Sequence, residues 1–183
     1  MSGRENVVVG LEARLHSYVP DLARHPDDYF AIDSIHEAIA ALKEGNFGAG
    51  CVIVTPNGTI VRRAHNGVFH PRFDSGGHAE CRAISEFEAT NMGSLRQYKV
   101  VASLEPCPMC TCRLITAGCG TVRYVAADPH GGMVRFIDRL PGEWSRLAAE
   151  ISWAQASCSN YLQILALDVF EASLALNDAL RAR

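Results

Sequence analysis

The clearest periodic pattern in the chain lies in residues 27–44. Its apolar residues recur every three or four positions: Tyr29, Ile32, Ile35, Ala38, Ile39 and Leu42. This spacing predicts an amphipathic helix, with Asp27 or Asp28 at its N-cap and Gly45 at its end. Residues 1–26 give a weaker helical signal before Pro20, and we expect them to be an N-terminal extension.

An alternation typical of strands follows. Residues 50–55 and 59–66 are predicted to pair as a hairpin, because Asn57 and Gly58 between two apolar runs are the strongest short-range hairpin signal. A loop then leads to a helix that begins near His78.

The next elements alternate between strand and helix. We predict strands at residues 96–104 and 121–127, and helices from His78 to about residue 90 and over residues 106–118. Alternation with short links predicts an α/β fold: a three-layer α/β/α sandwich with a mixed, partly parallel five-stranded sheet. Residues 141–151 and 168–181 look helical, while residues 161–167 fit either the fifth strand or more helix.

The 183 residues fit one domain, 1–183, with an N-terminal extension (about 1–26) and a C-terminal helical region (about 134–183). The apolar fraction of 48% and charged fraction of 20% are those of an ordinary soluble protein. Neither a signal peptide nor a run of about 20 apolar residues is visible, so we expect a cytoplasmic protein without a membrane partner.

The net charge of −3 argues against a nucleic-acid partner, which would be bound through clustered lysine and arginine. Seven cysteines, an odd number, indicate metal ligands and buried thiols more than disulfides. Four of the cysteines lie in apolar or helical surroundings and are expected to be small buried hydrophobes: Cys51, Cys81, Cys119 and Cys158.

A metal site is predicted from two separate motifs. Cys107 and Cys110 are spaced to share the first turn of a helix, where the dipole favours the thiolate form that binds zinc. His78 supplies a third ligand. Three protein ligands leave one coordination position open, and an open position is typical of catalytic Zn²⁺.

Glu80 is the candidate proton carrier. Residues two apart diverge by about 200° in the middle of a helix, so His78 and Glu80 can reach one pocket only at the open N-terminal end of their helix. A carboxylate there can take a proton from water and deliver it to a substrate, so the expected reaction is a hydrolysis.

The alternative is a structural zinc site without catalysis. Cys112 would then complete a closed set with His78, Cys107 and Cys110. Because Cys112 follows Cys110 by two residues, it should point to another side of the helix, which favours the open site.

These motifs resemble those of the cytidine-deaminase-like superfamily, whose zinc nucleobase deaminases carry H-x-E followed by P-C-x-x-C. Residues 103–110 (SLEPCPMC) and 125–129 (VAADP) resemble the branch of tRNA adenosine deaminases, guanine deaminases and fungal-type cytosine deaminases. The resemblance covers about residues 47–132. It implies a hydrolytic deamination, with Zn²⁺ bound by His78, Cys107 and Cys110 and with Glu80 as the proton shuttle that serves the ring nitrogen and the departing amine.

The same resemblance implies substrate contacts. Asn66 would bind the polar edge or sugar of the substrate, and Phe47 would stack on the base. Main-chain groups of Ala79 and Glu105 would contact the substrate carbonyl and the leaving amine. Four further residues are candidates for closing the pocket: Asp128, His130, Phe136 and Trp153.

The expected substrate is a small aminated purine or pyrimidine base, nucleoside or related heterocycle, and the alternative is adenosine in tRNA. Residues 177–183 hold only two arginines, unlike the short basic end of a tRNA-editing enzyme. A homodimer is expected because four apolar residues are spread around two helices that one sheet face cannot fully cover: Ile84, Met109, Leu114 and Ile115. The alternative is that the C-terminal region folds back and covers them within one chain.

Overall fold

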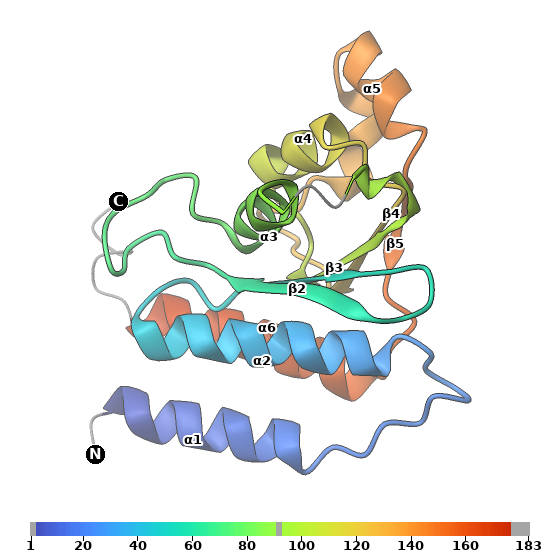
Figure 1. Ribbon diagram of the computed structural model, residues 1–183. Helices are drawn as coiled ribbons and strands as arrows, with labels where there is room; N and C mark the ends of the chain where they lie inside the picture. Colours follow the sequence, from blue (N-terminus) through green and yellow to red (C-terminus); the bar gives the residue numbers. More distant parts are fainter. Residues whose placement is uncertain (1–2, 91–92, 177–183) are drawn as a thin grey trace.

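A five-stranded mixed sheet forms the centre of the computed structural model, which describes residues 3–90 and 93–176 (Figure 1). The strands are β1 (Gly50–Val54), β2 (Ile60–His65), β3 (Lys99–Leu104), β4 (Thr121–Ala126) and β5 (Ser152–Gln155). Their order in the sheet is β2-β1-β3-β4-β5. Strand β1 is antiparallel to β2 and β3, whereas β3, β4 and β5 are parallel to one another. The predicted mixed sheet is confirmed.

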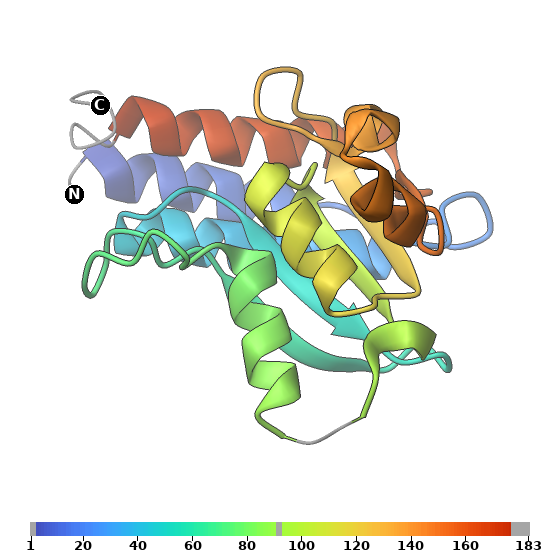
Figure 2. The same ribbon diagram turned by 90° about the horizontal axis from the view of Figure 1, so that it is seen from above.

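Helices cover both faces of this sheet. They are α1 (Gly3–His16), α2 (Asp28–Glu44), α3 (Ala79–Glu88), α4 (Pro108–Thr116), α5 (Gly142–Ala148) and α6 (Asn160–Leu176), with short 3-10 helices η1 (Leu95–Gln97) and η2 (Val134–Arg139). Helices α2 and α6 pack side by side on one face, and α3 and α4 lie on the other (Figure 1). The three-layer sandwich is therefore confirmed, and α1 adds an outer layer against α2 and α6 (Figure 2).

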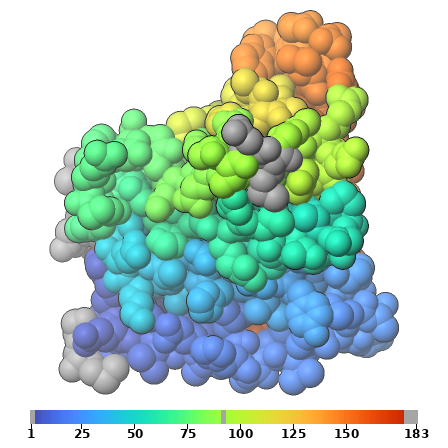
Figure 3. All heavy atoms as spheres, viewed as in Figure 1, coloured from blue at the N-terminus to red at the C-terminus, as the bar shows by residue number. Residues whose placement is uncertain are grey.

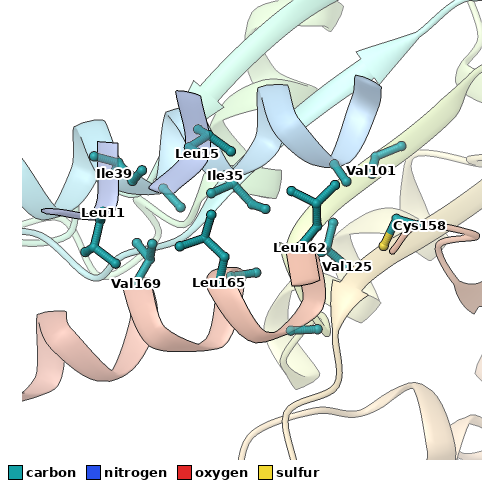
Figure 4. Close-up of a cluster of buried hydrophobic side chains, with 14 of the residues drawn as sticks. Leu11, Leu15, Ile35, Ile39, Val101, Val125, Cys158, Leu162, Leu165 and Val169 are labelled. Atoms are coloured by element: carbon teal, nitrogen blue, oxygen red, sulfur yellow. The ribbon is translucent and has the colours of Figure 1, made fainter. Parts of the chain in front are cut away.

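Successive side chains of β1 belong to two separate hydrophobic clusters, one on each face of the sheet. Val52 and Val54 join the cluster beneath α2 and α6, while Cys51 and Ile53 join the cluster beneath α3 and α4. This alternation follows from the two-residue period of a strand. Figure 4 shows the first cluster, where leucines of α1 and α6 meet isoleucines of α2 and strand valines.

The structure decides between the two alternatives for the C-terminal region. Residues 161–167 are helical within α6, and the fifth strand is Ser152–Gln155. That strand is short, lies at the sheet edge and is largely exposed, so it carries no apolar alternation that the sequence could reveal. The part of the predicted 168–181 helix beyond Leu176 lies outside the described residues.

A buried carboxylate ties the start of α2 to the start of α6. Asp28 is 0% exposed, and its Oδ2 accepts hydrogen bonds from the Tyr18 hydroxyl at 2.6 Å and the Asp21 main-chain N–H at 3.3 Å. Its Oδ1 accepts from the Ser159 main-chain N–H at 2.9 Å. The Asp28 carboxylate thus links the start of α2 to the loop before it and to the start of α6.

The apolar residues behind the dimer expectation are mostly covered within the chain. Ile84, Leu114 and Ile115 are buried in the cluster beneath α3 and α4, against which Leu147 of α5 also packs. Of the four residues only Met109 is exposed, at 40%. The C-terminal region therefore contributes to this cover, as the alternative to a second chain expected. Helix α5 stands out from the body of the molecule in Figure 3.

Among the residues that the structure describes, no helix combines the length and the apolar character needed to cross a membrane.

Candidate active site

The first half of the site lies at the N-terminus of α3. His78 is the N-cap residue, in extended conformation, and Glu80 follows in the first turn with 7% of its surface exposed. The preceding loop closes on itself where the Gly67 N–H donates to the Gly77 carbonyl at 2.8 Å. A Cβ on Gly77 would lie 2.9 Å from the Gly67 oxygen, so this close approach requires glycine. His78 and Glu80 thus sit at an open helix end.

The second half lies at the N-terminus of α4. Cys107 is its N-cap, Pro108 its first residue, and Cys110 is fully buried one turn later. Proline fits here because the first helical N–H has no partner to lose. Two helix N-termini therefore converge on the same point.

The three candidate ligand atoms have the spacing of a zinc site. His78 Nδ1 lies 3.7 Å from Cys107 Sγ and 3.5 Å from Cys110 Sγ, and all three atoms lie within 4.8 Å of one another. Tetrahedral Zn²⁺ with ordinary Zn–N and Zn–S bonds places such atoms about 3.6 Å apart. The residues therefore fit zinc. Cys112 is half-buried and is not a member of this group, so the closed set gains no support within the described residues.

The two candidate ligand thiols differ in acidity. The neighbouring Cys110 and His78 lower the pKa of Cys107 to about 4, whereas its neighbours Cys107 and Cys81, together with burial, raise the pKa of Cys110. Cys107 is therefore disposed to be a thiolate, the form that binds metal.

The remaining cysteines behave largely as expected. Cys51, Cys119 and Cys158 are buried, and Cys81 is half-buried. Burial raises the pKa of Cys119 to about 12 and that of Cys158 to about 11, so both are inert thiols at neutral pH.

Glu80 directs its carboxylate at the ligand group. The Cys110 thiol donates to Glu80 Oε2 at 3.2 Å. Burial raises the pKa of Glu80 above its ordinary value, because the charged form loses hydration. A carboxyl in this position can hold a proton near neutral pH more readily than an exposed one.

A cavity of about 220 Å³ opens beside these groups. It contains seven of the twelve residues that the sequence analysis assigned to zinc binding, proton transfer, substrate contact or closing of the pocket: Phe47, Asn66, His78, Glu80, Glu105, Cys107 and Asp128. Ala79 and Cys110 do not line it and are buried. Of the four candidates for closing the pocket, only Asp128 lines it. Trp153 instead donates its indole N–H to the Ala148 carbonyl at 2.9 Å.

The side-chain amide of Asn66 has a hydrogen-bond partner for its oxygen but none for its nitrogen within the described residues. Its Oδ1 accepts from the Val68 N–H at 3.1 Å, and its own main-chain N–H donates to Ala49 at 2.9 Å. The residue is 2% exposed and lines the cavity. Its Nδ2 has no partner within the described residues, so two N–H donors face the cavity.

The Glu105 side chain organises one wall. Its buried carboxylate accepts from the Asp128 N–H at 3.1 Å and the Val134 N–H at 3.0 Å. These bonds hold the loop that brings Asp128 and Gly131 to the cavity. Sequence reasoning missed this role of Glu105, because nothing in the local pattern says which loop the carboxylate meets.

Sequence reasoning also missed Phe170 of α6, which lines the cavity from the far end of the chain. Helix α6 has apolar residues on much of its surface. Its sequence therefore does not single out Phe170.

Comparison with known proteins places this site in a family. Residues 25–126 match the family described as the cytidine and deoxycytidylate deaminase zinc-binding region. The chain belongs to this family. It is therefore a zinc-dependent hydrolase that acts on C–N bonds of cyclic amidines, and its cofactor is zinc.

Two relatives are tRNA-specific adenosine deaminases. The deaminase of Aquifex aeolicus is 35% identical over 115 residues, which is 62% of this chain and 75% of the relative. That of Bacillus subtilis is 35% identical over 107 residues, 58% of this chain and 65% of the relative.

Solved structures share the fold of this deaminase. A structure from a study of tRNA:A34 deaminases is 30% identical, with a TM-score of 0.54, and covers 58% of this chain and 81% of its own. A guanine deaminase from Nitrosomonas europaea is 19% identical, with a TM-score of 0.56, and covers 78% of this chain and 84% of its own. At that identity the second likeness concerns the fold alone.

Proposed function

We propose that this deaminase acts on a small aminated purine or pyrimidine base, nucleoside or related heterocycle, and releases ammonia. The cavity carries this proposal. Its volume of about 220 Å³ is below the range of roughly 300–1,000 Å³ usual for drug-sized ligands. Its lining includes the carboxylates of Glu80, Glu105 and Asp128 but neither lysine nor arginine, which disfavours a phosphate group inside it.

In this proposal His78, Cys107 and Cys110 hold the zinc, which supplies a Lewis acid that makes water a competent nucleophile at neutral pH. Glu80 accepts a proton from that water and passes it to the ring nitrogen of the substrate. The oxygen adds to the ring carbon that carries the amino group. Glu80 then carries the second proton to the amine, the C–N bond breaks, and ammonia leaves.

The other residues bind and orient the ring. The free amide N–H groups of Asn66 would donate to a carbonyl or ring nitrogen at the polar edge. The Ala79 N–H at the start of α3 has no helical partner and suits a substrate carbonyl, while the Glu105 carbonyl suits the leaving amine. Phe47 would stack on the ring, and Asp128 would limit the mouth.

The substrate is tested by measuring ammonia release from cytosine, guanine, adenine, their nucleosides and triazine analogues, beside inosine formation in tRNA. We expect turnover of at least one small compound, because the cavity admits a base and lacks cationic groups for a nucleic-acid backbone. Turnover confined to tRNA would contradict this proposal. It would favour the second candidate, which the 35% identity to two tRNA-specific adenosine deaminases supports.

A homodimer is a further expectation. It now depends on the exposed Met109, next to the ligand Cys110, since the other apolar residues of α3 and α4 are covered within the chain. Sedimentation at micromolar concentration should give about twice the chain mass. A single species near 19.9 kDa would show that the chain covers itself.

A further inference from the structure

The cavity has one aromatic wall that does not come from the part of the chain matched to the deaminase family. The family match ends at residue 126, whereas Phe170 lies on α6. Phe170 nevertheless lines the same cavity as His78 and Glu80. The family region alone would leave this side of the cavity without its wall.

Packing fixes the position of Phe170. A Cβ on Gly48 would lie 2.5 Å from the main-chain oxygen of Val169, so α6 lies directly against the segment that follows Phe47. Val169 itself is fully buried against α1 and α2 (Figure 4). The neighbouring Asp168 forms an ion pair with Arg14 of α1 at 2.7 Å. The helix is therefore held from both sides.

Phe170 and Phe47 are neighbouring rings that line the same cavity. Their ring centroids lie 6.3 Å apart with an interplanar angle of 27°, and the Phe69 centroid lies 5.2 Å from that of Phe47. Both cavity phenylalanines remain partly exposed, so ring surface is left open in the cavity. Aromatic faces of this kind bind flat heterocycles by stacking, whatever the pattern of donors and acceptors on the ring.

The rest of the lining is apolar apart from the polar and charged side chains already described. Its other members are small or aliphatic: Ala49, Gly50, Ala102, Leu104 and Gly131. The volume of about 220 Å³ leaves little space for a sugar beside a bound ring, and Phe170 is one of the side chains that limit this volume.

We propose that Phe170 is a specificity-determining residue: with Phe47 it stacks on a flat base and excludes the attached sugar, so that the free base is preferred over its nucleoside. This inference rests on the proposed deamination of a small heterocycle and names the class within it.

The test compares Phe170→Ala and Phe170→Leu with the unchanged zinc-loaded chain, using the base that releases most ammonia and the matching nucleoside. Loss of stacking should raise KM for the base about 5- to 150-fold in Phe170→Ala, with a much smaller change in kcat. The ratio of kcat/KM for base over nucleoside should fall about 10-fold or more, because the sugar gains room. Phe170→Leu should lose the stacking on the base but exclude the sugar better than Phe170→Ala does.

Ile164→Ala is the matched control, because Ile164 lies on α6 and is 50% exposed. It should leave both KM values unchanged. Equal KM values in Phe170→Ala and the unchanged chain, at unchanged thermal stability, would overturn the inference. So would an initial preference for the nucleoside.

Failure of the proposed function gives a different result. In that case no small compound releases ammonia from the unchanged chain. Calorimetric titration of the zinc-loaded chain with the free bases then decides the stacking role without turnover. Binding weakened in Phe170→Ala but not in Ile164→Ala supports it, and binding that is equal in both variants or absent overturns it.

Discussion

Replacing Glu80 with glutamine is expected to lower kcat by about 10²- to 10⁴-fold while the protein still binds about one zinc per chain. Glutamine keeps the shape of the side chain but cannot accept and return a proton. The three zinc ligands remain, since Glu80 contacts Cys110 without belonging to the ligand group. Ammonia release and metal content of the purified variant measure the two effects separately.

Glu88→Gln is the control for this substitution. Glu88 ends the same helix, pairs with Arg113 on the surface and does not line the cavity. Its loss should leave kcat unchanged. Activity that persists in Glu80→Gln would remove Glu80 from the mechanism, and loss of zinc from that variant would make it a structural residue.

Replacing Asp28 with alanine should destabilise the protein by about 3 kcal/mol or more. The substitution leaves three donors without their acceptor: the Tyr18 hydroxyl and the main-chain N–H groups of Asp21 and Ser159. Hydrogen bonds to a charged acceptor contribute about 1.5–3 kcal/mol each, and a donor left buried and unpaired costs more than one exposed to water. Urea unfolding followed by circular dichroism measures the loss.

Tyr18→Phe is the graded control, because it removes one of these three bonds and keeps the ring that stacks on Tyr161. It should cost about 1–2 kcal/mol. A loss below about 1 kcal/mol in Asp28→Ala would mean that water replaces the carboxylate and that α6 is anchored by its apolar contacts alone.

Each half of the zinc site could be predicted because its information is local. Cys107 and Cys110 lie on one helical turn, and only the start of a helix lets His78 and Glu80 face one point. That the two halves, with His78 and Cys107 29 residues apart, form one site was inferred from the family motif. The hairpin was equally local, since Asn57 and Gly58 determine a turn by themselves. The structure has both features where the sequence indicated them.

Other features depended on which distant segments meet. Strand β5 is short and exposed, so its identity follows from pairing with β4 and not from its own residues. Glu105 supports the cavity wall because its carboxylate accepts hydrogen bonds from the 128–134 loop, a contact that its local sequence does not reveal. Leu147 of α5 packs against the cluster beneath α3 and α4, whereas the sequence alone left open whether the C-terminal region or a second chain covers these helices.

Phe170 shows the difference most clearly. Helical periodicity tells which residues share a face of α6 but not what that face meets, because an apolar residue satisfies a core and a ligand cavity equally well. The position of Phe170 at the cavity follows from two contacts: Asp28 anchors the start of α6, and α6 approaches Gly48 closely at Val169. The sequence by itself thus indicated the chemistry of this deaminase, through two short motifs, each of residues close together in the chain. The tertiary structure decided the shape of the space around that chemistry, because side chains from distant segments build its walls.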